Sequence, residues 1–222
     1  MGLRTTALCA AVLLSPAGGA ATPPCAAPAG IAAPAVPESM CSREVARSGG
    51  IAVREMGLPA AETLVAGSFE APQWGVVIDY GVRSVLDYFA GDNAQGRELP
   101  GARTTPVTFR QRAYPNGTVY EWTSAMMAST AQFPDPAALP AGIVPLRLER
   151  VGRRLIAAVQ FTTAALPSQL DFAAACGGIT PGALPPGYAP NASSPWTPTY
   201  AIYSAEKSPA YECECWVEVS AG

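Results

Sequence analysis

The sequence predicts an α+β fold: an open, distorted antiparallel β-barrel of two β-α-β-β halves with two flanking helices. Hydrophobic residues make up 49% of the 222 positions and charged residues only 14%, which is enough apolar material for a buried core. The 23 prolines and 21 glycines indicate many turns and few long helices. Short strand-like segments and two helical segments follow one another in an order that occurs twice, which suggests an internal duplication.

The first helix is predicted over Trp74–Phe89, where apolar residues recur at spacings of three and four. Gly91 is a natural stop for it. A second, shorter helix is predicted over Ser168–Ala175 and ends at Gly177-Gly178. Each helix needs a sheet against which to bury its apolar face.

Strands are predicted where short β-rich segments lie between turn residues. Asn116-Gly117 between two such segments predicts a hairpin, and Gly152 predicts another between the segments beside it. The predicted strands are Glu44–Ala46, Ile51–Met56, Glu62–Phe69, Val107–Arg112, Thr118–Met127, Leu146–Glu149, Leu155–Phe161, Thr199–Ser204 and Cys213–Val219.

The N-terminal region has the pattern of a leader. Residues 1–21 are predicted to be a signal peptide, with Arg4, the apolar run Leu8–Leu14 and small residues after it. Residues 22–40 are an Ala/Pro-rich extended segment, and residues 41–222 form the domain. We expect secretion or residence in the secretory lumen, with plastid or mitochondrial targeting as the alternative. No later segment reaches the ~20 apolar residues of a membrane-spanning helix.

The cysteines fit an oxidising compartment. Cys25 and Cys41 flank the proline-rich segment, and a disulfide there would close a short loop. Cys213 and Cys215 share one face of a strand, so pairing one of them with Cys176 is more plausible than pairing them together. A metal site is not expected, because a single C-x-C lacks four ligands. Two sequons, at Asn116 and Asn191, are glycosylation candidates.

Composition excludes several functions. The chain has no histidine, which rules out histidine-dependent triads and histidine ligation of zinc or haem. The net charge of -3 and the lack of basic clusters give no field that would attract nucleic acid. Nothing in the sequence brings Glu149 and Asp171 together as a carboxylate pair, so we do not expect an enzyme.

Several segments, in order, resemble the SOUL haem-binding family over about residues 38–220. The most specific match is Gly81–Asn93, which resembles the family's helix-to-loop signature "G-F-x-x-L-x-x-Y-I-x-G-x-N". Met56 and Arg103 depart from the family's usual tyrosine and methionine. The weaker matches are Val53-Arg54-Glu55, Thr104–Val107, Ala157–Phe161, Thr199–Tyr203 and Trp216–Val219.

The resemblance implies binding of haem or another tetrapyrrole in a shallow apolar groove beside the first helix, here without histidine ligation. The groove candidates are Ile78, Val82, Val85, Leu86, Arg83, Arg103, Trp196 and Lys207. A helix must bury one face in any case, so Val82 and Val85 are more readily explained as core. Asp79 and Asp87 stand where the family often has cations for the propionates. Tyr88 and the Met126-Met127 pair are better explained as buried packing residues than as iron ligands.

Three functions therefore remain open. The first is a carrier, scavenger or buffer of a planar apolar molecule. The second is a secreted interaction or structural domain on the same scaffold that has lost ligand binding, and Asp79 and Asp87 favour it. The third is an enzyme that modifies a small hydrophobic molecule, which would need a deep pocket with a perturbed carboxylate.

Overall fold

The protein is described by a computed structural model covering residues 40–57, 62–70, 74–113, 119–130, 132–194, 198–203 and 210–222. Those residues form a ten-stranded sheet and two α-helices. The elements are β1 (Ser42–Ser48), β2 (Ile51–Met56), β3 (Glu62–Phe69), α1 (Trp74–Phe89), β4 (Val107–Ala113), β5 (Val119–Met127), the 3-10 turn η1 (Pro136–Ala138), β6 (Leu146–Val151), β7 (Arg154–Thr163), α2 (Gln169–Gly177), β8 (Tyr188–Pro190), β9 (Thr199–Ile202) and β10 (Tyr211–Ala221).

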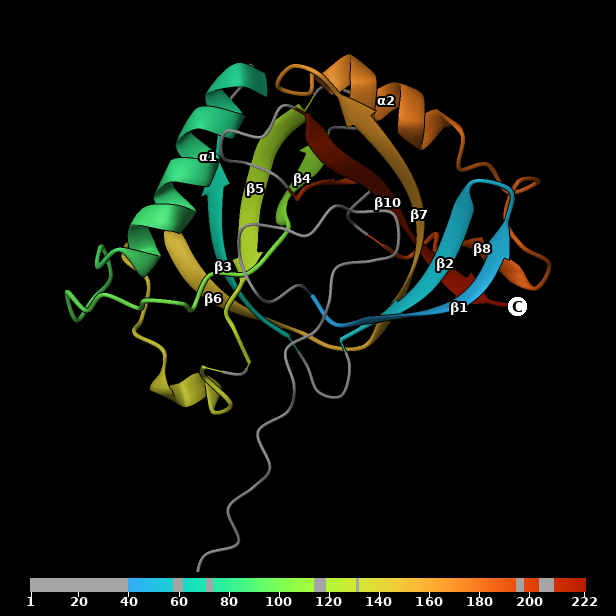
Figure 1. Ribbon diagram of the computed structural model, residues 1–222. Helices are drawn as coiled ribbons and strands as arrows, with labels where there is room; N and C mark the ends of the chain where they lie inside the picture. The colour runs from blue at the N-terminus through green and yellow to red at the C-terminus, as the bar shows by residue number, and fades with distance from the viewer. Residues whose placement is uncertain are drawn as a thin grey trace, which may run out of the picture.

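The sheet is antiparallel and open. Its strand order is β1-β2-β7-β10-β9-β4-β5-β3-β6, and β8 pairs with the far end of β10. The sheet curls round, and both helices lie on its outer side (Figure 1). No pairing in the described part of the chain joins the two end strands, β1 and β6. The prediction of an α+β, open and barrel-like fold with two flanking helices is thus confirmed.

Apart from the end strand β1, the strand order is symmetric about the β9–β4 seam. The strands β7, β10 and β9 lie on one side of this seam, and α2 packs against β10 and β7. The strands β3, β5 and β4 lie on the other side, and α1 packs against β5 and β3. Each side also receives a strand from the other half of the chain: β2 pairs with β7, while β6 pairs with β3. The two sides are therefore linked by exchanged edge strands as well as by the central seam.

One predicted pairing was wrong. The sequence around Gly152 predicted a hairpin between Leu146–Glu149 and Leu155–Phe161, but β6 and β7 lie at different sides of the sheet. Gly152 sits where the chain crosses from one side to the other. The prediction failed because a glycine between two strands marks a turn without fixing which strands pair. The short β8 and η1 were not predicted, since each has only three residues and both are rich in proline and alanine.

Helix α1 is positioned by burial of one face and by a close approach to the sheet. Val77 and Val85 are fully buried against strands. Gly81 faces Ser124 on β5 so closely that a Cβ on Gly81 would lie 2.7 Å from Ser124 Oγ. The helix ends before Gly91, whose φ of 115° suits only glycine readily. Glycine at position 81 thus lets the helix lie directly on the sheet.

Helix α2 is held by a cap and a disulfide. Ser168 and Asp171 form a capping box, with Ser168 Oγ accepting from the Asp171 amide. At the other end Cys176 is bonded to Cys215 on β10. This pairing confirms the prediction that Cys176 bonds one of the two cysteines of β10. Cys213 is a free, buried thiol. Cys41 is disulfide-bonded. Cys25 and the predicted leader lie outside the described residues.

Candidate functional site

A groove runs along one flank of α1 on the helix side of the sheet. Its volume is about 310 Å³, close to the lower end of the range for small-molecule sites. Side chains of α1 form one wall, the β4–β9 seam forms the floor, and the segment before α2 forms the other wall. The lining residues are Ile78, Asp79, Val82, Arg83, Leu86, Asp87, Val107, Leu166 and Ile202.

The floor of the groove lies at the centre of the sheet. Val107 is the first residue of β4 and Ile202 the last of β9, and the two are direct partners across the seam. Both side chains are 2% exposed and face the helices. The groove therefore rests on the line about which the strand order is symmetric.

Aromatic side chains pack together at the start of α1. Trp74 begins α1 and donates its indole N–H to the carbonyl of Pro167, 2.8 Å away, which ties the two helix entrances together. Its ring contacts those of Phe172 on α2 and Tyr200 on β9, which stack on each other at 4.4 Å. None of these rings is among the lining residues of the groove, whose α1 residues run from Ile78 to Asp87.

The rim of the groove is acidic. Asp79, Arg83 and Asp87 follow one another along a single exposed stripe of α1. Arg83 Nη2 lies 3.7 Å from Asp79 Oδ1, and both side chains are about 70% exposed, so the pair is weak. Two carboxylates and one guanidinium leave a net negative charge at the mouth.

The sequence-predicted groove residues divide into four groups. Ile78, Leu86, Val82 and Arg83 line the groove, and Val82 is half-buried there instead of being purely core. Val85 is fully buried in the core. Arg103, in a β-bridge with Ala128, is not among the lining residues, while Trp196 and Lys207 lie outside the described residues.

The alternative iron ligands are engaged in packing. Tyr88 is fully buried and donates its hydroxyl to the Pro140 carbonyl at 2.6 Å. Burial raises the pKa of Tyr88 to about 12, so it stays a neutral phenol. Met126 and Met127 are both buried in β5. In the described part of the chain, no group of three or more His, Cys, Asp or Glu side chains could hold a metal ion.

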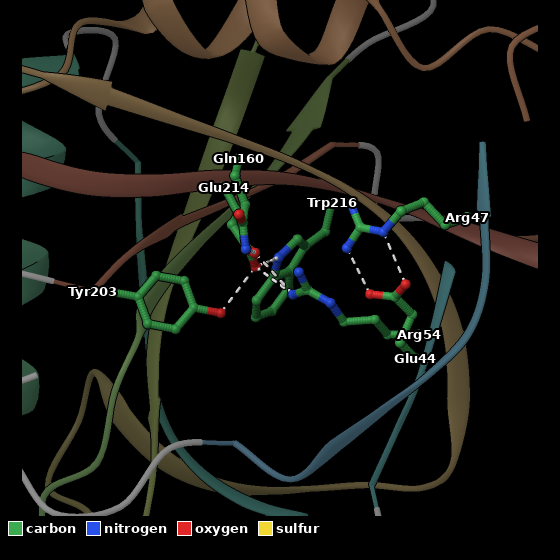
Figure 2. Close-up of polar contacts among 7 residues, drawn as sticks. All are labelled: Glu44, Arg47, Arg54, Gln160, Tyr203, Glu214 and Trp216. Carbon is green, nitrogen blue, oxygen red and sulfur yellow. Dashed lines mark hydrogen bonds and ion pairs between the residues drawn. The ribbon is translucent and has the colours of Figure 1, made fainter. Parts of the chain in front are cut away.

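A cluster of buried polar side chains occupies the inner face of the sheet, away from the helices (Figure 2). Glu214 on β10 is completely buried, and its carboxylate meets the guanidinium of Arg54 on β2 at 2.8 Å. Gln160, Tyr203 and Trp216 also donate to the Glu214 carboxylate, at 2.9, 2.9 and 2.7 Å. Alternation along the strands places these side chains inside while Cys213 and Cys215 face α2.

The cluster is internally satisfied. Burial and the Glu214 carboxylate raise the pKa of Tyr203 well above its ordinary value, so the phenol remains a hydrogen-bond donor. The adjoining cavity, bounded in part by Met40 and Trp216, holds only about 30 Å³, roughly enough for one water molecule. The cluster therefore joins β2, β7 and β10 to Tyr203, the residue after β9.

The two carboxylates considered as a catalytic pair have separate roles. Asp171 caps α2, and its hydrogen bonds with Ser168 lower its pKa. Glu149 on β6 accepts from Arg110 on β4 at 3.0 Å. Burial tends to raise the pKa of Glu149, but Arg110 and Arg147 outweigh it, and the net shift is downward.

Sequence reasoning missed the Arg54–Glu214 pair, although one signal was present. Each residue is a charge within a largely apolar strand, although Ile51–Met56 also carries Glu55 and Cys213–Val219 also carries Glu218. Such a charge, on a strand covered on both faces, must have a buried partner. The signal does not identify that partner, because 160 residues separate the two.

The sequence matches no known family model and no curated protein. Among solved structures, the chain is similar to the C-terminal domain of EcmrR, with 9% identity and a TM-score of 0.50 over 78% of this chain and 98% of that one. EcmrR in a DNA complex gives 9% identity and a TM-score of 0.53, over 78% of this chain and 57% of that one. A hydrolase from Listeria innocua gives 8% identity and a TM-score of 0.50, over 79% and 94%.

At these identities the similarity shows the fold alone. The three structures come from two proteins, EcmrR, which is seen in a DNA complex, and a hydrolase, and neither is described as haem-binding. Neither described helix of the present chain is long and apolar enough to cross a membrane.

Proposed function

We propose that the chain is a non-catalytic binding protein for a flat apolar molecule of the tetrapyrrole type, held in the α1 groove. The proposal rests on the aliphatic side chains that line the walls and floor of the α1 groove. The aliphatic side chains are Ile78, Val82, Leu86, Val107, Leu166 and Ile202. The resemblance to the SOUL family supports the same ligand class.

The energetics favour modest affinity. Burying about 300 Å² of apolar ring surface contributes about 7 kcal/mol. Loss of translational and rotational freedom opposes this by at least about 4 kcal/mol. These two terms leave about 3 kcal/mol, and neither a histidine bond to iron nor a basic rim adds to it, so we expect a dissociation constant in the millimolar range.

The rim charge defines which ring binds best. Asp79 and Asp87 repel propionates, and Arg83 is shared with Asp79. A neutral macrocycle such as protoporphyrin dimethyl ester should therefore bind more tightly than hemin with two free propionates. The difference is several-fold, because an exposed charge pair is worth only about 1 kcal/mol.

Titration of the folded protein with both rings, followed by the Soret band and tryptophan quenching, tests the proposal. Leu166→Asp puts a charge on the wall at a side chain that is 51% exposed, so folding should survive and ester binding should fall at least tenfold. Leu170→Asp is the matched control, since Leu170 is 80% exposed and does not line the groove. Equal binding by both variants and the parent chain, or no binding of either ring, would refute the proposal.

A further inference from the structure

We propose that Asn191 is an acceptor for an N-linked glycan and that the hollow beside it holds the first sugar. The sequon Asn191-Ala192-Ser193 follows directly after β8, at the end of the sheet formed by β8 and β10. The inference is independent of the α1 groove and rests on the local geometry of this segment.

The backbone at the sequon is fixed while the acceptor nitrogen is free. The Asn191 amide N–H donates to the carbonyl of Glu218 at 2.8 Å, which anchors the segment to β10. The Ser193 N–H donates to Asn191 Oδ1 at 3.1 Å, so the side-chain oxygen is already engaged. Asn191 Nδ2 has no hydrogen bond within the described residues. Ala192 and Ser193 are exposed, as a modifying enzyme requires.

A hollow of about 440 Å³ with mixed polar and apolar walls is lined in part by Asn191. Its mixed walls suit a sugar, because hydroxyl and acetamide groups need charged or polar partners and the ring face needs aliphatic contact. The lining residues are Glu55, Arg153, Arg154, Leu155, Asn191, Glu218 and Val219. Glu55 is held in place by contacts with Arg43 and Arg153. The hollow is thus a preformed cradle for the first N-acetylglucosamine.

The reaction needs a glycosyl donor and a transferase of the secretory pathway. Asn191 Nδ2 attacks C1 of a lipid-pyrophosphate-linked oligosaccharide, the N–C1 bond forms, and the C1–O bond to pyrophosphate breaks. Nδ2 loses one proton and the lipid pyrophosphate leaves. The Cys176–Cys215 disulfide is compatible with folding in that oxidising compartment.

The first test is secretion of the full chain from glycosylating cells, with a C-terminal tag that carries its own sequon to report entry into the lumen. Asn116→Gln removes the other sequon. Tag-glycosylated protein should carry a second glycan on a tryptic or chymotryptic peptide containing Asn191. Ser193→Ala should abolish it while keeping the backbone N–H that holds Asn191. A glycosylated tag with unmodified Asn191 would overturn the assignment.

The second test concerns the cradle. Endoglycosidase trimming leaves one N-acetylglucosamine on Asn191, and the trimmed protein is compared with unglycosylated Ser193→Ala by thermal unfolding. We expect the trimmed protein to melt at least about 2 °C higher, and Arg153→Ala to reduce this difference. Equal melting temperatures would show that the sugar projects into solvent, and would remove the cradle from the proposal.

Discussion

Replacing Glu214 by glutamine should cost about 3–5 kcal/mol of the free energy of unfolding. The Glu214 side chain is 0% exposed and that of Arg54 is 4% exposed, with 2.8 Å between Nη1 and Oε1. Glutamine keeps the shape but leaves the guanidinium buried without a counter-charge. Its amide group also brings N–H donors to a position where Tyr203 and Trp216 already donate.

This loss is large relative to the stability of a typical domain, which is about 5–15 kcal/mol. Replacing both charges, in Arg54→Met with Glu214→Leu, should cost less than Glu214→Gln alone, because no unpaired charge remains. The single variants Arg54→Met and Glu214→Leu and the double variant form a thermodynamic cycle from which the coupling between the side chains is obtained.

Urea unfolding with the disulfides intact, followed by far-ultraviolet circular dichroism, measures these differences. For a slope near 2 kcal/mol/M, Glu214→Gln should lower the midpoint by about 2 M. A loss below about 1 kcal/mol, or a double variant less stable than both single variants, would refute the reasoning that the pair is held by mutual neutralisation in the interior.

Three further predictions concern other parts of the fold. Replacing Cys176 and Cys215 together by alanine removes a cross-link between positions 39 residues apart and should cost about 4 kcal/mol in the same urea assay; a loss under 1 kcal/mol would contradict it. Gly81→Ala should cost about 1–3 kcal/mol, because its Cβ would lie 2.7 Å from Ser124 Oγ, and an unchanged melting temperature would show that the helix can shift freely. The lowered pKa of Glu149 contributes stability that is present above pH 4.5 and is lost as pH falls through the lowered value. Glu149→Gln should therefore make the free energy of unfolding depend less on pH in this acidic range. An unchanged dependence on pH there would contradict the assignment.

The local sequence pattern was sufficient to predict the helices and most strands, but it did not predict which strands pair with one another. The helix over Trp74–Phe89 was predicted end to end, because its periodicity and Gly91 are local signals. The strand Glu62–Phe69 was likewise predicted with its observed bounds, but its pairing with β6 was not. Pairing depends on sheet curvature and on which apolar faces meet, which the spacing of residues within one segment does not encode.

The same division applies to the groove. Ile78, Val82 and Leu86 could be proposed from sequence because they share one flank of a single helix. Val107 and Ile202 reach the floor from strands 95 positions apart, counted from their residue numbers, and only the register of β4 and β9 brings them together. The pairing of Arg54 with Glu214 could not be predicted for the same reason.

The exchange of edge strands has a consequence for how the chain completes its structure. Ile51 on β2 pairs with Val159 on β7, and Gly67 on β3 pairs with Leu146 on β6. In a growing polypeptide, β2 and β3 therefore each have an unpaired edge until β7 and β6 have been synthesised. Pairing between strands so far apart in sequence is typical of slow folding. Cleavage of the chain between β5 and β6 would give two fragments, each of which lacks an edge strand that the other carries. The two fragments should therefore fold only when they are mixed.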